Sequence, residues 1–157
     1  MNILQSSILP KEGIGEIKLL MNYNLVKKYL YDNKIEYKEE YWSNERYTQN
    51  VPWKVIRIAK CISMFFAYDK LWKFYLEEGF EGKLPNGIYI GMDINEAKKL
   101  DKTAALDDWD EEYISAEGYR FEDSLETGKV VSITIAIPEV IFGDENGTEF
   151  YSYEWAK

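Results

Sequence analysis

The sequence predicts a single α+β domain over residues 1–157, an antiparallel sheet with helices packed on one face. We expect two related strand-helix-hairpin halves, at about 13–84 and 85–138, followed by a C-terminal tail. Three observations lead to this prediction: a strand-to-helix segment in the second half, a copy of it in the first half, and hairpin patterning after each copy.

Residues 86–100 have the pattern of a short strand that turns sharply into a helix. Ile88 and Ile90 alternate with small or polar neighbours, which is the period-two signature of a strand. Asp93 and Glu96 have the spacing of a capping box, which satisfies free backbone amides at a helix start. We therefore expect a helix to begin directly after Asp93.

Residues 15–30 repeat much of this pattern. When Met21 is aligned with Met92, one isoleucine and two adjacent lysines are identical, and Asn22 also suits an N-cap. Leu25 stands where the second copy has its glutamate, so the full capping box is missing. Two copies predict one supersecondary unit used twice and sharing a core. The alternative is two unrelated amphipathic helices that agree by chance.

Alternating apolar residues predict the strands that follow. Residues 54–68 are rich in β-branched and aromatic side chains, and Tyr68-Asp69-Lys70 is a turn candidate before a strand at 71–77. A long helix over 55–76 is the competing interpretation. A second hairpin is expected over 118–137, and the aromatic, acidic tail is a candidate for one more.

Composition narrows the class of protein. Apolar residues make up 46% of the chain, which is enough for a core, and aromatic residues reach 16%. Tyrosine and tryptophan anchor many interfaces, so we expect some to be exposed for a partner; an aromatic-rich core is the alternative. The net charge of −9 repels nucleic acid and anionic membranes and attracts a basic protein, although solubility alone also explains it.

Several kinds of catalytic site are excluded by residue type. The chain has no histidine and one cysteine, Cys61, which we expect to be a buried thiol. Zinc clusters, Ser–His and Cys–His pairs and phosphate-binding glycine loops are absent from the sequence. Ser–Lys and threonine variants of the usual nucleophilic arrangements remain open. We expect no cofactor and no metal. The start of the chain resembles no signal peptide, and no stretch has membrane-spanning length, so a cytoplasmic location is expected.

Two acidic, aromatic segments are the candidate partner-binding residues. The simplest interpretation is a solvated acidic loop, and an electrostatic patch with a tryptophan anchor is the second. Carboxylate catalysis or calcium binding is a third, but the spacing fits no EF-hand loop. The predicted contact residues are Asp107, Asp108, Trp109, Asp110, Glu111 and Glu112, together with Glu39, Glu40 and Trp42.

The segment from Gly87 to Ala97, Gly-Ile-Tyr-Ile-Gly-Met-Asp-Ile-Asn-Glu-Ala, resembles the opening of tandem domains similar to beta-lactamase inhibitor protein. With residues 107–113 and the closing hairpin, it resembles cytoplasmic immunity proteins of bacterial contact-dependent inhibition and related polymorphic toxin systems. This resemblance implies a protein that binds and neutralises a cognate toxin domain and has no catalytic activity. The acidic charge suggests that the toxin domain is a basic nuclease. A small carboxylate-dependent hydrolase and an envelope or phage interaction module of the same fold remain alternatives, and the oligomeric state stays open.

Overall fold

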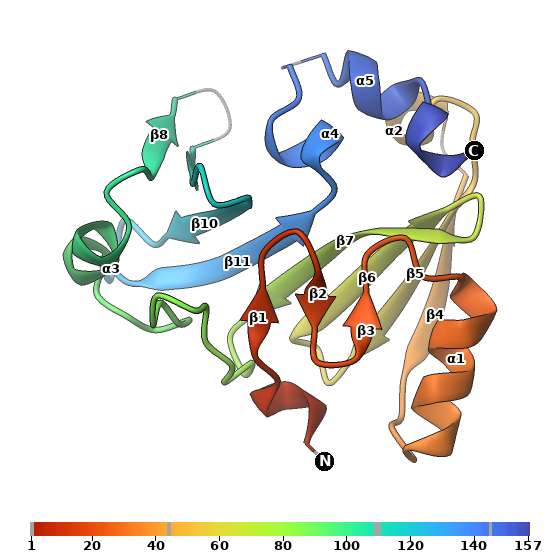
Figure 1. The fold of residues 1–157 in the computed structure, drawn as a ribbon, viewed down its shortest axis with the longest axis horizontal. Coiled ribbons are helices and arrows are strands. Elements are labelled where there is room, and N and C mark those ends of the chain that lie inside the picture. Colours follow the sequence, from red (N-terminus) through yellow and green to blue (C-terminus); the bar gives the residue numbers. More distant parts are fainter. Residues whose placement is uncertain (1, 44, 109–110, 145) are drawn as a thin grey trace.

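The computed structural model describes residues 2–43, 45–108, 111–144 and 146–157 (Figure 1). The strands are β1 (Ile8–Leu9), β2 (Gly13–Ile14), β3 (Ile17–Lys18), β4 (Lys38–Trp42), β5 (Trp53–Ile58), β6 (Ile62–Ala67), β7 (Lys70–Glu77), β8 (Ala105–Asp107), β9 (Glu112–Ile114), β10 (Tyr119–Asp123) and β11 (Val130–Ala136). The helices are η1 (Ile3–Gln5), α1 (Tyr23–Asp32), α2 (Glu45–Thr48), α3 (Ile94–Leu100), α4 (Pro138–Ile141), α5 (Thr148–Tyr151) and η2 (Glu154–Ala156), where η denotes a 3₁₀-helix.

One large antiparallel sheet organises the molecule. Eight strands pair in the order β4-β5-β6-β7-β11-β10-β9-β8, and β1-β2-β3 form a separate small sheet. The large sheet therefore has two edge strands, β4 and β8, while β7 and β11 pair at its centre. This arrangement confirms the predicted α+β class with an antiparallel sheet.

Both hairpins of the first half turn without glycine. Tyr68 and Asp69 link β6 to β7 with φ angles of 51° and 60°, the left-handed conformation of a two-residue hairpin turn. The hairpin predicted at this turn is therefore confirmed. Ala59 and Lys60 turn the chain between β5 and β6 with φ angles of 52° and 62°. Alanine and lysine are not usual turn-forming residues, so the sequence pattern predicted one extended stretch over 54–68 without a turn at Ala59 and Lys60.

The entry to α3 follows the prediction only in part. The Asp93 carboxylate accepts hydrogen bonds from the amides of Asn95 and Glu96, at 2.9 and 3.3 Å, so the predicted helix start is confirmed. The strand predicted at Ile88 and Ile90 is wrong, because these residues lie in an irregular segment. Ile88 is fully buried there, so its apolar character reflects core packing without strand pairing.

The two faces of the sheet carry separate apolar cores. Ile56 of β5 packs in a cluster with Val26 of α1 and Ala97 of α3. Its neighbour Val55 points to the other face and packs in a cluster with Phe150 of α5. The prediction of helices on one face only is therefore wrong for the C-terminal tail, which is helical where a hairpin was considered and covers part of the second face (Figure 1).

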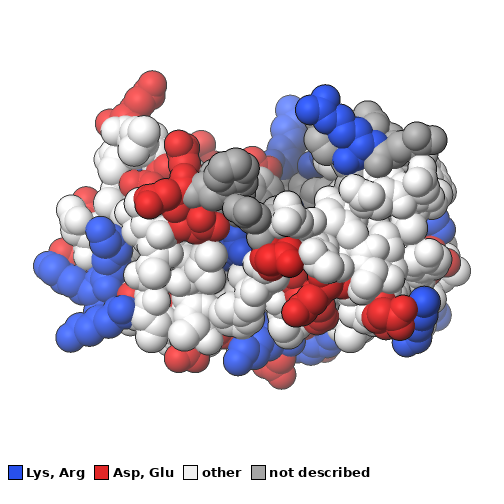
Figure 2. Space-filling model, turned by 90° about the horizontal axis from the view of Figure 1, so that it is seen from above, with Lys and Arg blue, Asp and Glu red and all other residues white. Residues whose placement is uncertain are grey.

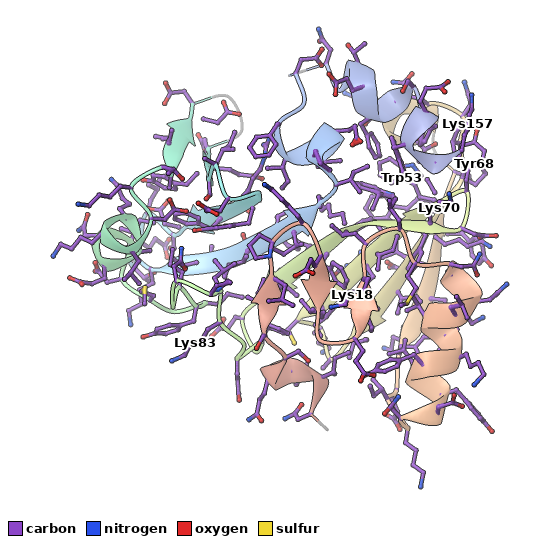
Figure 3. All side chains as sticks on the ribbon, viewed as in Figure 1. Lys18, Trp53, Tyr68, Lys70, Lys83 and Lys157 are labelled. Carbon is purple, nitrogen blue, oxygen red and sulfur yellow. The ribbon has the colours of Figure 1, made fainter. Side chains whose placement is uncertain are left out.

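A buried hydrogen-bond relay fastens this tail to the sheet. The indole Nε1 of Trp53 donates to the hydroxyl of Tyr153 at 3.0 Å, and that hydroxyl donates to the backbone oxygen of Thr48 at 2.7 Å. Figure 3 shows Trp53 beneath the C-terminal helical segment, with Tyr68 and Lys157 near the same end. The tail is thus tied to β5 and to the end of α2 by groups that have no access to water as an alternative partner.

In the part of the chain that is described, no helix is long and apolar enough to cross a membrane.

Candidate functional site

A groove of about 480 Å³ lies on the sheet face that carries the C-terminal tail. Every strand of the large sheet except β11 contributes a residue to its lining, and the rest come from the tail. Figure 2 looks onto this side of the molecule and shows acidic side chains gathered near its middle. We call this site the groove, and its lining consists of Trp42, Trp53, Phe65, Trp72, Lys73, Asp107, Ile114, Arg120, Glu139, Val140, Gly143, Asp144, Asn146, Gly147, Phe150 and Tyr151.

One end of the groove is a wall of aromatic rings. Trp42 stacks on Trp53 with ring centroids 6.0 Å apart, and it meets Phe65 edge-on at 5.6 Å. Trp72 contacts Trp53 at 4.9 Å, and Phe150 of α5 lies 4.4 Å from Trp72. Such contacts hold the rings in fixed orientations, so the wall is preorganised for a ligand or partner.

Arg120 joins the floor of the groove to the tail. Its guanidinium donates to the backbone oxygens of Ile141 at 2.8 Å and of Val140 at 3.2 Å. It also forms an ion pair of 3.5 Å with Glu112 of β9. Arg120 is therefore a structural tie between β10, the acidic hairpin and the end of α4.

Lys73 is the second cation of the floor. Its ammonium nitrogen lies 4.8, 5.8 and 5.6 Å from the ring centres of Phe65, Trp72 and Tyr75. Burial lowers the pKa of Lys73, and this effect outweighs the attraction of nearby carboxylates. The groove thus holds a half-buried amine that lies close to three aromatic rings.

A neighbouring polar network occupies the same sheet face. The hydroxyls of Tyr75 and Ser132 both donate to the Glu122 carboxylate, at 3.0 and 2.7 Å. Burial, as the main cause, raises the pKa of Tyr75 to about 12. Sequence reasoning singled out none of these residues, nor Lys73. The only available signal was a polar residue at every second position of an otherwise apolar strand.

Among the described acids that were predicted in the second half, Asp107 lines the groove. Glu112 is its register partner on β9. Asp108 and Glu111, between these strands, are exposed. Trp109 and Asp110, also predicted contacts, lie outside the described residues.

The predicted residues of β4 separate between the two faces. Trp42 lines the groove, so the edge strands β4 and β8 both contribute to one site. Glu39 accepts a hydrogen bond from the Tyr23 hydroxyl and forms an ion pair of 2.9 Å with Lys27, and these partners lower its pKa. Glu40 pairs with Arg57. These two glutamates are therefore engaged within the molecule and do not line the groove.

Among the described side chains, no group of three or more histidine, cysteine, aspartate or glutamate residues is placed to hold a metal ion. No family model, curated protein or solved structure matches the chain.

Proposed function

We propose that this chain is a cytoplasmic immunity protein that binds a cognate bacterial toxin domain through the groove and its acidic rim. The observation that carries the proposal is the convergence of Trp42 and Asp107, from opposite edges of the sheet, on one site. Both residues belong to segments that the sequence marks as acidic and aromatic. A rigid aromatic wall beside exposed acids is the composition of a protein-binding hot spot with a charged rim.

The charges of the rim favour a basic partner. Asp144, which lines the groove, is exposed, as are Asp108 and Glu111, the chain neighbours of Asp107 and Glu112. The whole chain carries a net charge of −9. Domains that act on nucleic acid are basic because they must hold phosphates. Exposed acids accelerate the encounter with such a domain, whereas buried aromatic contacts slow its dissociation.

We also propose that the chain consists of two related halves. Equivalent hydrogen bonds at the two helix entries support this idea. The amide of Leu71 donates to the oxygen of Met21 at 3.1 Å, and the amide of Val130 donates to the oxygen of Met92 at 2.8 Å. The first residues of α1 and α3 each donate a further bond of 2.8 Å to the adjoining hairpin turn. Each half thereby docks its helix on the second arm of its own hairpin.

The proposal is tested by capture of the partner and protection from it. The chain is used as bait in its native host, and the captured protein is expressed alone in a bacterial strain that lacks the bait. We expect the captured protein to arrest growth and co-expression of the bait to restore it. A captured protein that leaves growth unchanged, or that still arrests growth beside a well-expressed bait, contradicts the proposal.

Charge variants locate the binding surface. The rim variant, Asp108→Lys with Glu111→Lys, reverses two exposed acids next to the β8–β9 pair Asp107 and Glu112, of which Asp107 lines the groove. Glu16→Lys with Glu126→Lys makes the same charge change at exposed positions that do not adjoin a lining residue. We expect only the rim variant to lose protection at limiting expression. Equal protection by both double variants would remove the groove from the proposal.

A further inference from the structure

A bulge in β7 places two consecutive side chains on the same face of the sheet. Phe66 pairs with Leu71, and the next pair is Phe65 with Lys73, so Trp72 has no register partner. As a result both Trp72 and Lys73 line the groove, while their neighbours point to the opposite core. Bulges re-aim side chains in this way and are enriched next to functional sites.

Neither of these two residues has an acceptor for its polar hydrogens in the described part of the structure. The indole Nε1 of Trp72 is buried and without a hydrogen-bond partner. Lys73 forms no ion pair with a described carboxylate, and its ammonium lies over the rings of Phe65, Trp72 and Tyr75. A buried donor without an acceptor costs free energy, so the unsatisfied Trp72 indole beside an unpaired ammonium calls for an explanation.

The carboxylates nearest to Lys73 are already used by other groups. Glu122 accepts the hydroxyls of Tyr75 and Ser132, and Glu112 pairs with Arg120. Both glutamates attract the Lys73 ammonium from a distance, yet neither reaches it. Among the residues that the structure describes, the floor of the groove therefore presents one cation that no carboxylate neutralises by contact.

We infer that Trp72 and Lys73 form a carboxylate-binding subsite, which takes an acidic side chain of the partner protein. A carboxylate accepts bonds from an ammonium and an indole N–H together, and a charge-assisted bond of this kind is about twice as strong as a neutral one. The aromatic wall would surround the methylene stem of such a side chain. The inference rests on the proposed function in one respect, namely that the partner toxin is the protein that supplies the carboxylate.

The rim indicates how that acidic side chain is presented. Asp107, Glu139 and Asp144 line the groove around the subsite and repel a free anion. Basic residues on either side of the inserted carboxylate would pair with these acids. The expected occupant is therefore an aspartate or glutamate flanked by lysine or arginine on the surface of a basic protein.

The subsite is tested on the full chain without any toxin. Two blocked tripeptides, lysine-glutamate-lysine and lysine-glutamine-lysine, are titrated into ¹⁵N-labelled protein while the indole N–H signals are followed by NMR. Trp72→Phe assigns the Trp72 signal. We expect the glutamate peptide to shift this signal saturably and to bind about tenfold more tightly than the glutamine peptide.

Two lysine variants show whether the preference depends on the subsite. Lys73→Met is expected to remove the difference between the peptides. Lys70→Met, on the same strand but outside the groove, is expected to retain it (Figure 3). Phenylacetate, a free carboxylate with an apolar body, should bind more weakly than the glutamate peptide because it brings no positive charge to the rim.

The outcomes separate this inference from the proposed function. Equal affinities for the two peptides, or no saturable shift with either, would overturn the subsite even if Lys73→Met failed to fold. Tighter binding of phenylacetate would overturn the assignment to a basic segment. A partner toxin that is neutralised despite equal peptide affinities would leave the proposed function standing and overturn the subsite alone.

Discussion

Substitution of Tyr153 by phenylalanine tests how the C-terminal tail is held on the sheet. The side chain is 4% exposed, and its hydroxyl stands between the Trp53 indole and the backbone oxygen of Thr48. Tyr153→Phe removes one oxygen atom and keeps the ring contacts. It leaves the buried indole N–H of Trp53 without its acceptor, whereas the Thr48 oxygen still accepts from the Val51 amide at 3.1 Å.

The expected loss follows from that indole donor. A buried polar group left unsatisfied costs about 1–3 kcal/mol, so the variant should lose about that much unfolding free energy. A domain of this length usually has a total of about 5–15 kcal/mol, and the midpoint of thermal unfolding should fall by roughly 2–12 °C. Tyr31→Phe is the matched control because Tyr31 is 82% exposed, and it should change stability by less than about 0.5 kcal/mol.

Urea unfolding followed by tryptophan fluorescence measures both variants, since Trp53 is itself part of the relay. If Tyr153→Phe were as stable as Tyr31→Phe, the tail would not be anchored by this relay. The groove, of which the tail forms one side, would then lack the rigidity that the proposed function requires.

Three further predictions concern stability. Ala59→Asn with Lys60→Gly should stabilise the protein by about 1 kcal/mol, because asparagine and glycine suit the two left-handed turn positions; a loss in urea unfolding would contradict that turn. Burial alone would raise the pKa of Asp101, but hydrogen bonds from three neighbouring hydroxyls lower it below 3.8. The ionised Asp101 should therefore stabilise the folded state above pH 3.8, and this contribution should be lost on further acidification. Asp101→Asn should weaken that acid dependence, and an unchanged acid profile would contradict the network. Burial lowers the folded-state pKa of Lys73 below 10.5, so the folded protein loses this proton at a lower pH than the unfolded chain. The wild type should therefore gain stability relative to Lys73→Met as pH rises toward 10.5. Parallel pH profiles of the two proteins would refute this.

The central strands of the large sheet could be predicted from sequence because they follow strong local patterns, whereas β4, β8 and β9 were not predicted. Alternation along β6 and β11 and the cap at Asp93 each depend on neighbouring residues only. The turn at Ala59 and Lys60 was not accessible, because left-handed non-glycine residues are stabilised by the strands they join and leave no signature of their own. The helical tail was missed for a similar reason: its short helices depend on packing of residues such as Phe150 against the sheet.

The groove was predictable only in outline. Composition and charge directed attention to Trp42 and Asp107, but their place in one lining depends on strand order, which local patterns do not encode. The assignment of Glu39 and Glu40 as contacts did not anticipate their ion pairs, since Lys27 and Arg57 come from α1 and β5. Lys73 was overlooked because a single lysine in a β-prone stretch is usually solvated, whereas a bulge turns this one toward the aromatic wall.

The central claim is that a basic protein binds at the acidic rim of the groove. The most direct test measures the association rate constant of the captured partner with the wild type, with Asp108→Lys/Glu111→Lys and with Glu16→Lys/Glu126→Lys, at low and high salt. We expect the rim variant alone to associate about tenfold more slowly at low salt, and the difference to shrink as salt is added. Equal rate constants for the two double variants, with no dependence on salt, would contradict the claim.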